Sequence, residues 1–266
     1  MRSRWTGLGA VIALVTWCCG PGHAATTGDP SVAARVVVHA GFTGSEDGLP
    51  RRISVCLPPE YEADPSRRYP VIYAFDGQDL FDPATAAGGD EWAIDELLQA
   101  RPPGIAPVIV VGIESRGWLE QAPPGSHPQA HVDAFLRFVA HELKPFVDRA
   151  YRTRLDAAST ALMGEGIAGL GALYGTWTNP STFGNAIVLG LPDVDAKSTA
   201  WSASAPRGSR PHLWIDQRSA SDAIRPSSTQ FVAALQRGAE VQFHVAGAQT
   251  SRIVRVAAAL RALCPE

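Results

Sequence analysis

The chain has 266 residues, of which 45% are hydrophobic and 18% charged, and its formal net charge is −3. This is the composition of a globular protein, and the length is sufficient for one large hydrophobic core. A mildly acidic chain lacks the basic surface on which nucleic acids and anionic membranes bind, so neither is expected as a partner.

Residues 1–24 are predicted to be a signal peptide. Arg2 and Arg4 form a basic start, and the apolar stretch LGAVIALVTW that follows is too short to span a bilayer. The small residues of GPGHAA then provide a cleavage site. Removal of the two arginines takes the net charge from −3 to −5. Residues 25–266 are predicted to form a single domain without a membrane span, exported to the periplasm or secreted.

Strand-like and helix-like segments alternate from about residue 34 onwards. Short runs rich in β-branched and apolar residues predict strands over residues 34–41, 51–59, 69–77, 106–113, 185–190, 210–216 and 239–247. Apolar residues at helical spacing predict helices over residues 90–100, 131–151, 228–238 and 251–263. Residues 191–210, rich in Ser, Ala and Pro, are interpreted as a long loop or lid-like insertion. This alternation predicts an α/β fold with a mainly parallel sheet covered by helices on both faces.

The stretch STALMGEGIAGLGALYG, residues 159–175, has the outline of a nucleophile elbow. An apolar strand leads into a tight turn of small residues, and an apolar helix follows. The motif that belongs to such a turn is G-x-S-x-G, and the serine at its tip attacks the substrate. Here the turn reads GEGIA, so Gly166 occupies the serine position.

Four further segments surround the elbow in a definite order. They are RRISVCLPPEYEADPSRRYPVIYAFDGQDLFD, VIVVGIESRGWLEQAPP, FVAHELKPFVDRAYRT and NPSTFGNAIVLG. Their order and spacing resemble the Putative esterase family of the α/β hydrolases, which includes enterochelin esterases and esterase D-like proteins. The resemblance covers residues 34–264, and it implies an α/β-hydrolase fold and carboxylic ester hydrolysis.

The resemblance implies a Ser-His-Asp triad, from which the sequence departs at two positions. Gly166 stands at the nucleophile position, and Gln249, in GAQT after the last predicted strand, stands at the base position. For the acid, DQRSASD supplies Asp216 and Asp222, of which Asp222 is the better placed. Glycine has no attacking atom, and an amide is no general base near neutral pH. We therefore expect a protein that binds a small ligand or a partner protein without ester turnover.

An active hydrolase with displaced groups is the alternative. His244, near the end of the last predicted strand, is the candidate for a displaced base with Asp222 as its acid, acting on a siderophore-like or other acyl ester. Glu165 is the rival nucleophile, because carboxylates form covalent intermediates. Its place before the tip predicts that it points away from the attacked atom, near a helix N-terminus whose dipole favours negative charge. A purely structural role with a collapsed pocket is a third alternative.

The resemblance also implies an oxyanion hole built from backbone N–H groups. Ile167, the residue after the tip, supplies one donor, and the loop DGQD with Gly77 and Gln78 resembles the loop that supplies the second. Backbone donors survive the loss of side chains. A pocket that binds a carbonyl or a carboxylate is therefore expected to persist.

Two cysteines remain after the predicted signal peptide, Cys56 and Cys264. In an oxidising compartment they would pair and fasten the last helix to an early strand; alternatively, they are two separate buried thiols. The sequence has no His, Cys, Asp or Glu pattern at metal-ligand spacing. It also has no Walker loop, and no cofactor is expected.

Overall fold

The computed structural model describes residues 34–45, 48–115, 128–194, 199–204, 206, 208–219 and 224–264. The signal peptide predicted over residues 1–24 lies outside them. One eight-stranded sheet has the order β1-β2-β4-β3-β5-β6-β7-β8. Its strands are β1 Arg35–Thr43, β2 Pro50–Leu57, β3 Val71–Phe75, β4 Ile109–Ile113, β5 Thr160–Glu165, β6 Asn185–Leu189, β7 His212–Ser219 and β8 Glu240–Gly247.

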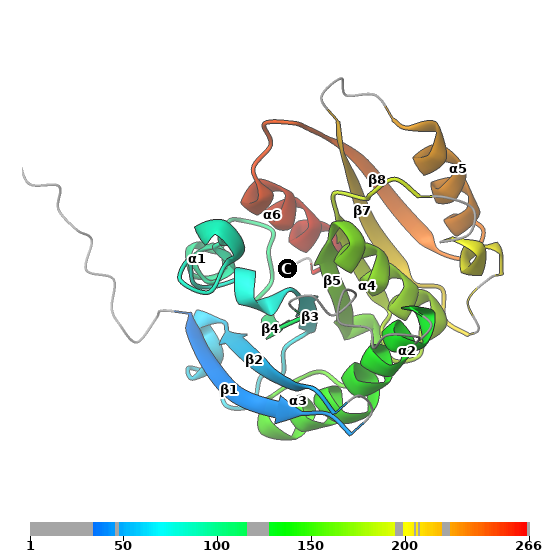
Figure 1. Cartoon of the computed structure of the whole chain (residues 1–266). Helices are drawn as coiled ribbons and strands as arrows, with labels where there is room; N and C mark the ends of the chain where they lie inside the picture. The colour runs from blue at the N-terminus through cyan, green and yellow to red at the C-terminus, as the bar shows by residue number, and fades with distance from the viewer. Residues whose placement is uncertain are drawn as a thin grey trace, which may run out of the picture.

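Most of this sheet is parallel. β1 pairs antiparallel with β2, and β2 pairs antiparallel with β4, whereas all the other neighbours pair parallel. Parallel neighbours need crossover connections, which are usually helices that cover the faces of the sheet. The predicted mainly parallel sheet of an α/β-hydrolase fold is confirmed (Figure 1).

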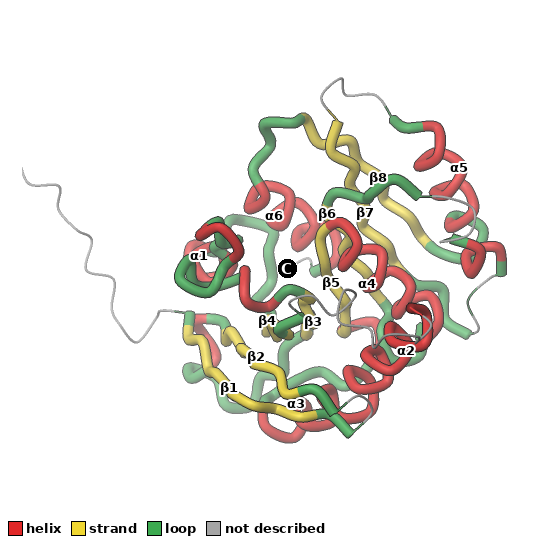
Figure 2. The backbone as a smooth tube through the Cα atoms, in the orientation of Figure 1, coloured by secondary structure: helices red, strands yellow, loops and turns green. Residues whose placement is uncertain are grey.

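Helices cover both faces of the sheet (Figure 2). β6 shows the division, because Ile187 and Leu189 pack in one core cluster with α1 and α6, whereas Ala186 and Val188 pack in another with α4 and α5. Among the described helices, none is both long and apolar enough to cross a membrane. Their bounds are α1 Ile94–Ala100, α2 Pro128–Phe138, α3 Lys144–Ala150, α4 Gly166–Thr178, α5 Pro226–Leu235 and α6 Arg252–Leu263.

Two predicted helices differ from the structure. The helix expected over residues 131–151 is divided into α2 and α3 by a π-helical turn over Val139–Leu143. Pro145 follows this turn, and its ring would clash with the carbonyl four residues earlier in a continuous α-helix. The helix expected over residues 90–100 begins only at Ile94, because Ala93 has a left-handed φ of +54°.

The segment over residues 191–210 is anchored on α4 and α5 in its described part. Trp201 packs edge-to-face against Tyr174 and Trp177 of α4, with ring centroids 5.5 and 5.8 Å away. At 1.5 Å per helical residue, these two residues lie roughly 12 and 16 Å along α4 from Gly166. Trp201 therefore packs at the end of α4 that is remote from the elbow.

Cys56 and Cys264 are free thiols in the structure, buried in the same core cluster. The structure therefore has two separate buried thiols and not a disulfide between these cysteines. Burial raises the pKa of Cys264 to about 11 and that of Cys56 still further. Both sulfurs behave as small apolar groups that pack α6 against the sheet.

Candidate functional site

The predicted elbow is a sharp turn between β5 and α4. Gly166 at its tip has a φ of +60°, in the left-handed region that residues with a side chain rarely adopt. A Cβ placed on Gly166 would meet no atom within 4 Å. The turn thus has the backbone of a nucleophile elbow and an open tip without a side chain.

Two further glycines allow α4 to return close to β5. A Cβ on Gly164 would lie 2.5 Å from the carbonyl carbon of Ala168, and a Cβ on Gly169 would lie 2.7 Å from the carbonyl oxygen of Gly164. Both contacts are with backbone atoms, which cannot rotate away as a side chain does. These glycines set the spacing between strand and helix, with or without a nucleophile.

Gly164→Ala is expected to destabilise the protein more than Gly166→Ala. The first change overpacks against the backbone and costs about 3 kcal/mol, whereas the second costs about 1–2 kcal/mol of left-handed strain. Scanning calorimetry should therefore give Gly164→Ala a Tm roughly 2–8 °C below that of Gly166→Ala. Equal melting temperatures would contradict the close approach of α4 to β5.

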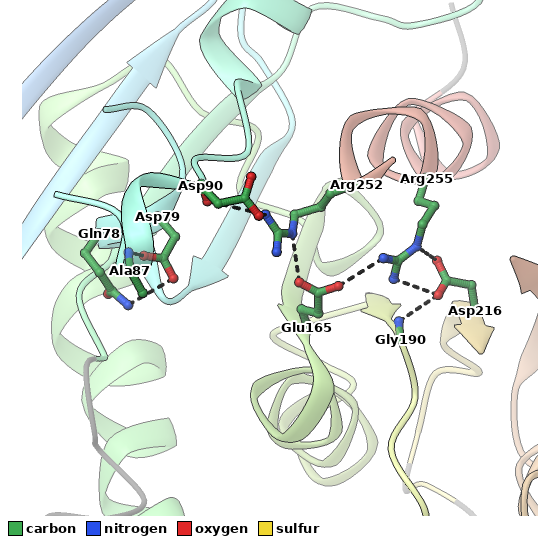
Figure 3. Close-up of polar contacts among 9 residues, drawn as sticks. All are labelled: Gln78, Asp79, Ala87, Asp90, Glu165, Gly190, Asp216, Arg252 and Arg255. Carbon is green, nitrogen blue, oxygen red and sulfur yellow. Dashed lines mark hydrogen bonds and ion pairs between the residues drawn. The ribbon is translucent and has the colours of Figure 1, made fainter. Parts of the chain in front are cut away.

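Glu165, the last residue of β5, is held by two arginines of α6. Its Oε2 accepts a hydrogen bond from Nε of Arg252 at 2.8 Å, and its Oε1 accepts one from Nη1 of Arg255 at 3.0 Å (Figure 3). Its side chain makes no capping hydrogen bond to α4. Both carboxylate oxygens are engaged with α6, so Glu165 is poorly suited to act as a nucleophile.

Arg255 continues this network to β7. Its side chain is only 3% exposed, and it donates from Nε and Nη2 to the two carboxylate oxygens of Asp216, each at 2.8 Å. The N–H of Gly190 donates to Asp216 Oδ1 at 2.6 Å. Burial alone would lower the pKa of Arg255, but the carboxylates of Asp216 and Glu165 raise it above its ordinary value. The guanidinium is therefore a permanent buried charge whose partners must balance it.

Arg252 extends the network to the loop before α1. Its Nη1 donates to Oδ2 of Asp90 at 3.2 Å, and its guanidinium lies 5.2 Å from the ring centroid of Trp92. We call the five residues of this chain of ion pairs the elbow network: Asp90, Arg252, Glu165, Arg255 and Asp216 (Figure 3). It joins the elbow to β7, to α6 and to the loop before α1.

Of the two acid candidates, Asp216 and Asp222, the structure describes only Asp216. Asp216 is fully buried in β7, and its oxygens accept hydrogen bonds from Arg255 and Gly190. This carboxylate is engaged mainly with the buried guanidinium of Arg255, which disfavours a role in orienting a catalytic base. Asp222, the predicted acid, lies outside the described residues.

Gln249 lies in the turn after β8, where it is exposed. Together with Glu165 and Arg252 it lines a pocket of about 340 Å³, so the base position and one elbow residue share a cavity. Gly166 and Ile167 are not among the residues that line this pocket. The described residues that line this pocket include the hydroxyl groups of Thr250 and Ser251 but no histidine or cysteine. Its carboxylates belong to Asp90, Glu91 and Glu165, and its guanidiniums to Arg218, Arg252 and Arg255. Among the described residues, no group of three or more His, Cys, Asp or Glu is placed to hold a metal.

His244 is not brought to the elbow. Its ring stacks on Trp214 with centroids 5.1 Å apart and an interplanar angle of 27°. His244 lies on the edge strand β8, opposite Asp216 of the neighbouring strand β7. β8 is three strands away from β5 in the sheet. Three strand spacings amount to roughly 14 Å, which is too far for a hydrogen bond to a group at the elbow. The prediction of His244 as a displaced base has no support in this arrangement.

The loop after β3 adjoins the elbow, because β3 and β5 are neighbours in the sheet. Gly77 in this loop approaches β4 so closely that a Cβ would lie 2.4 Å from the carbonyl carbon of Gly112. Gln78 is buried, and its Oε1 accepts from the N–H of Ser115 at 3.4 Å. Gly77 and Gln78 line a separate pocket with residues of β1 and β2, and not the pocket of Gln249.

Asp76, which precedes this loop, has a left-handed φ of +56°. Its N–H donates to Oγ of Ser115 at 2.5 Å, and that hydroxyl donates to Asp76 Oδ1 at 2.8 Å. Burial raises the pKa of Asp76, the hydrogen bond from Ser115 lowers it, and the nearby charges of Asp79 and Glu165 raise it. The loop is therefore fixed by its own contacts beside the elbow.

Ile167 is the second residue of α4, and its side chain is 59% exposed beside the tip. The first four N–H groups of an α-helix have no acceptor within the helix, and the partial positive charge of the helix N-terminus adds to their attraction for oxygen. The predicted backbone donor therefore lies next to the open tip, where a carbonyl or carboxylate oxygen can approach it.

The elbow network is not evident from the amino-acid sequence. Arg252 and Arg255 are three residues apart in the closing helix, which places both on one face. This spacing is the sequence feature that could have indicated a shared partner. Their partner Glu165 lies 87 and 90 positions away in the chain, so only the fold joins them.

Comparison with known proteins gives a matching family and similar curated proteins. Residues 46–253 match the family described as Putative esterase. The uncharacterised protein YjcH of Bacillus subtilis is 33% identical over 142 residues, which cover 53% of this chain and 55% of that protein. The ferri-bacillibactin esterase BesA of the same bacterium is 26% identical over 154 residues, which cover 49% of this chain and 50% of that protein. The chain spans about half the length of these curated relatives.

Solved structures show the same fold. The chain resembles an IroE-like serine hydrolase from Shewanella oneidensis with a TM-score of 0.63 and 19% identity, over 87% of this chain and 80% of that one. A resemblance at 19% identity shows that the two chains share the arrangement of strands and helices. What this chain can do chemically must be argued from its own residues at the elbow.

Proposed function

This chain belongs to the Putative esterase family, and from that premise we propose that it is a member without serine-based ester hydrolysis that binds a small polar ligand at the elbow. The observation that carries the proposal is Gly166, which gives the turn its left-handed tip without an attacking atom. Loss of the serine alone costs such an enzyme on the order of a million-fold in turnover. Gln249, at the base position, cannot take the proton of a nucleophile.

Ligand binding is supported by what lies beside Gly166. The N–H of Ile167 is a backbone donor at a helix N-terminus, which suits a carbonyl or carboxylate oxygen. The pocket beside it has three carboxylates and three guanidiniums, and the exposed amide of Gln249 both donates and accepts hydrogen bonds. These groups favour a ligand of mixed polarity over an apolar one. The name of BesA makes siderophore-like acyl esters, and the acids derived from them, the first ligands to test.

We expect that a serine-directed fluorophosphonate does not label the wild-type chain. We also expect 4-nitrophenyl butyrate to hydrolyse no faster with the wild-type chain than in buffer alone. Labelling is measured by intact-protein mass spectrometry, and hydrolysis by the release of nitrophenol. Gly166→Ala is the matched control, since it should behave as wild type does in both assays.

Covalent labelling of wild type would contradict the proposal. A label mapped to Ser251 or Thr250, the hydroxyl residues of the pocket, would identify a displaced nucleophile and favour an active hydrolase. Turnover well above the buffer rate that persists in Gly166→Ala would have the same meaning.

Export and domain organisation belong to the same proposal. We propose that residues 1–24 direct export and that residues 25–266 act as one domain in the periplasm or outside the cell. The basic start, short apolar stretch and small-residue boundary of residues 1–24 support this. The N-terminal sequence of the protein secreted by a bacterial host tests it, and an intact N-terminus would contradict it.

A further inference from the structure

A second pocket lies at the opposite end of the parallel strands from the elbow. It has a volume of about 220 Å³ and is lined by Val71, Ala161 and Asn185, at or next to the first residues of β3, β5 and β6. The elbow follows the last residue of β5. The two sites are therefore separated by the length of the sheet, and neither shares a lining residue with the other.

Three arginines line this pocket, which we call the arginine pocket: Arg67, Arg68 and Arg154. No carboxylate is among the described residues that line it. None of the three guanidiniums forms an ion pair with a carboxylate that the structure describes, although the elbow network shows how closely this chain pairs its other arginines. The hydrogen bonds from Ser66 and the charge of Arg67 lower the pKa of Asp64, so a carboxylate is near Arg67, but it does not line the pocket. Three neighbouring positive charges repel one another and attract an anion.

Contacts with the protein orient two of these guanidiniums. Nη1 of Arg68 donates to the carbonyl oxygen of Thr153 at 3.2 Å. The guanidinium of Arg67 lies over the ring of Tyr69, 5.4 Å from its centroid. A side chain that is already held loses less conformational freedom when a ligand binds.

Arg154 completes the pocket next to the end of α6. Arg154 and Cys264, the residue that follows α6, both line the pocket. Burial raises the pKa of Cys264, whereas the charge of Arg154 lowers it. Asn185 adds a side-chain amide, whose Nδ2 donates a hydrogen bond to the carbonyl oxygen of Ala158 at 2.8 Å. The pocket thus presents three guanidiniums, two of them oriented by contacts with the protein, beside an amide at the strand ends.

We propose that the arginine pocket binds a phosphate group. Guanidinium groups present a planar fork of N–H donors that matches the oxygens of phosphate two at a time, and such charge-assisted bonds are roughly twice as strong as neutral ones. The pocket accommodates a phosphate with part of the molecule that carries it. This binding does not depend on the function proposed for the elbow, because it uses other residues at the other end of the sheet.

Calorimetric titration of the wild-type chain with inorganic phosphate tests this proposal, with sodium chloride keeping the ionic strength constant. We expect saturable binding at one site. Arg154→Ala and Arg68→Ala should each raise the Kd at least about tenfold, because each removes a charge-assisted contact. Arg237→Ala is the matched control, since Arg237 is exposed at the end of α5, outside the arginine pocket, and its loss should leave the Kd unchanged.

Circular dichroism shows whether each variant is folded, and Arg67→Lys, which keeps the charge but removes the fork, provides a milder change. Its Kd should rise by less than that of Arg154→Ala. Absence of binding to wild type, or an equal loss in Arg237→Ala, would overturn the proposal. An unchanged Kd in both Arg154→Ala and Arg68→Ala would do so as well.

The phosphate group can belong to a soluble metabolite or to a lipid headgroup, and a second arm separates these sources. Glycerol 3-phosphate is titrated as the soluble probe, and vesicles of phosphatidylglycerol are compared with vesicles of phosphatidylcholine by cosedimentation. Binding of glycerol 3-phosphate without cosedimentation assigns a soluble ligand. Cosedimentation with phosphatidylglycerol alone, lost in Arg154→Ala, assigns a headgroup.

Discussion

A chain that carries both Gly166→Ser and Gln249→His is expected to hydrolyse 4-nitrophenyl butyrate at least about a hundredfold faster than the unchanged chain, the lower bound of what a positioned base contributes. Serine restores an attacking oxygen at a tip whose backbone is already left-handed and where a Cβ meets no neighbour. Histidine restores a base in the turn after β8, in the pocket that Glu165 also lines. Initial rates and stoichiometric fluorophosphonate labelling at position 166 measure the gain.

Three controls make this result specific. Gly166→Ala with Gln249→His lacks the attacking oxygen and should show no gain, and Gly166→Ser alone should gain little without its base. Adding Ile167→Pro to the active double variant removes the N–H next to the tip, at a helix position where proline is tolerated. Loss of that donor should reduce the gained rate by about 10²–10³-fold. A folded double variant that is neither labelled nor active would contradict a retained elbow.

The second large effect concerns stability. Asp216→Ala is expected to lower the free energy of unfolding by about 3–5 kcal/mol, because it leaves the buried guanidinium of Arg255 without its bidentate partner. In a chain of this length the Tm should fall by roughly 6–20 °C. Urea unfolding followed by circular dichroism and scanning calorimetry measure the two quantities.

An exposed ion pair provides the matched control. Arg35 and Glu62 are 3.3 Å apart with side chains 60% and 68% exposed, so Glu62→Ala should cost less than about 1 kcal/mol. Replacing both buried partners, with Asp216→Leu and Arg255→Met together, should recover much of the loss. If Asp216→Ala costs no more than Glu62→Ala, Arg255 is not held as the structure has it.

The sequence predicted the elbow because that part of the fold is local. The apolar strand, the small residues of the turn and the apolar helix are contiguous, and the glycines at positions 164 and 169 are required by contacts within the same turn. The strand order could be anticipated only as a mainly parallel sheet, since alternation does not specify which strands are neighbours. The positions of Gly166 and Gln249 followed from the motif, and the structure brings the elbow and Gln249 to one pocket through Glu165.

The polar contacts of the site could not be predicted in the same way. Nothing local in β7, which contains Asp216, indicates whether its carboxylate would serve a base or a buried arginine, and its partner Arg255 lies 39 positions away. The same holds for His244, because the alternation of β8 gives its face but not the indole of Trp214 on which it stacks. Contacts between side chains of distant elements depend on register and packing, which periodicity does not determine.

The elbow network also determines how this part of the protein opens. Asp216 holds the N–H of Gly190 after β6, Arg255 and Arg252 hold the first turn of α6, and Glu165 holds the end of β5. Local opening of any one of these elements would expose an unpaired buried charge, so they should open together. Hydrogen exchange should therefore give the amide of Gly190 and the amides of the first α6 turn that are bonded within the protein the same free energy of opening, after correction for their intrinsic exchange rates.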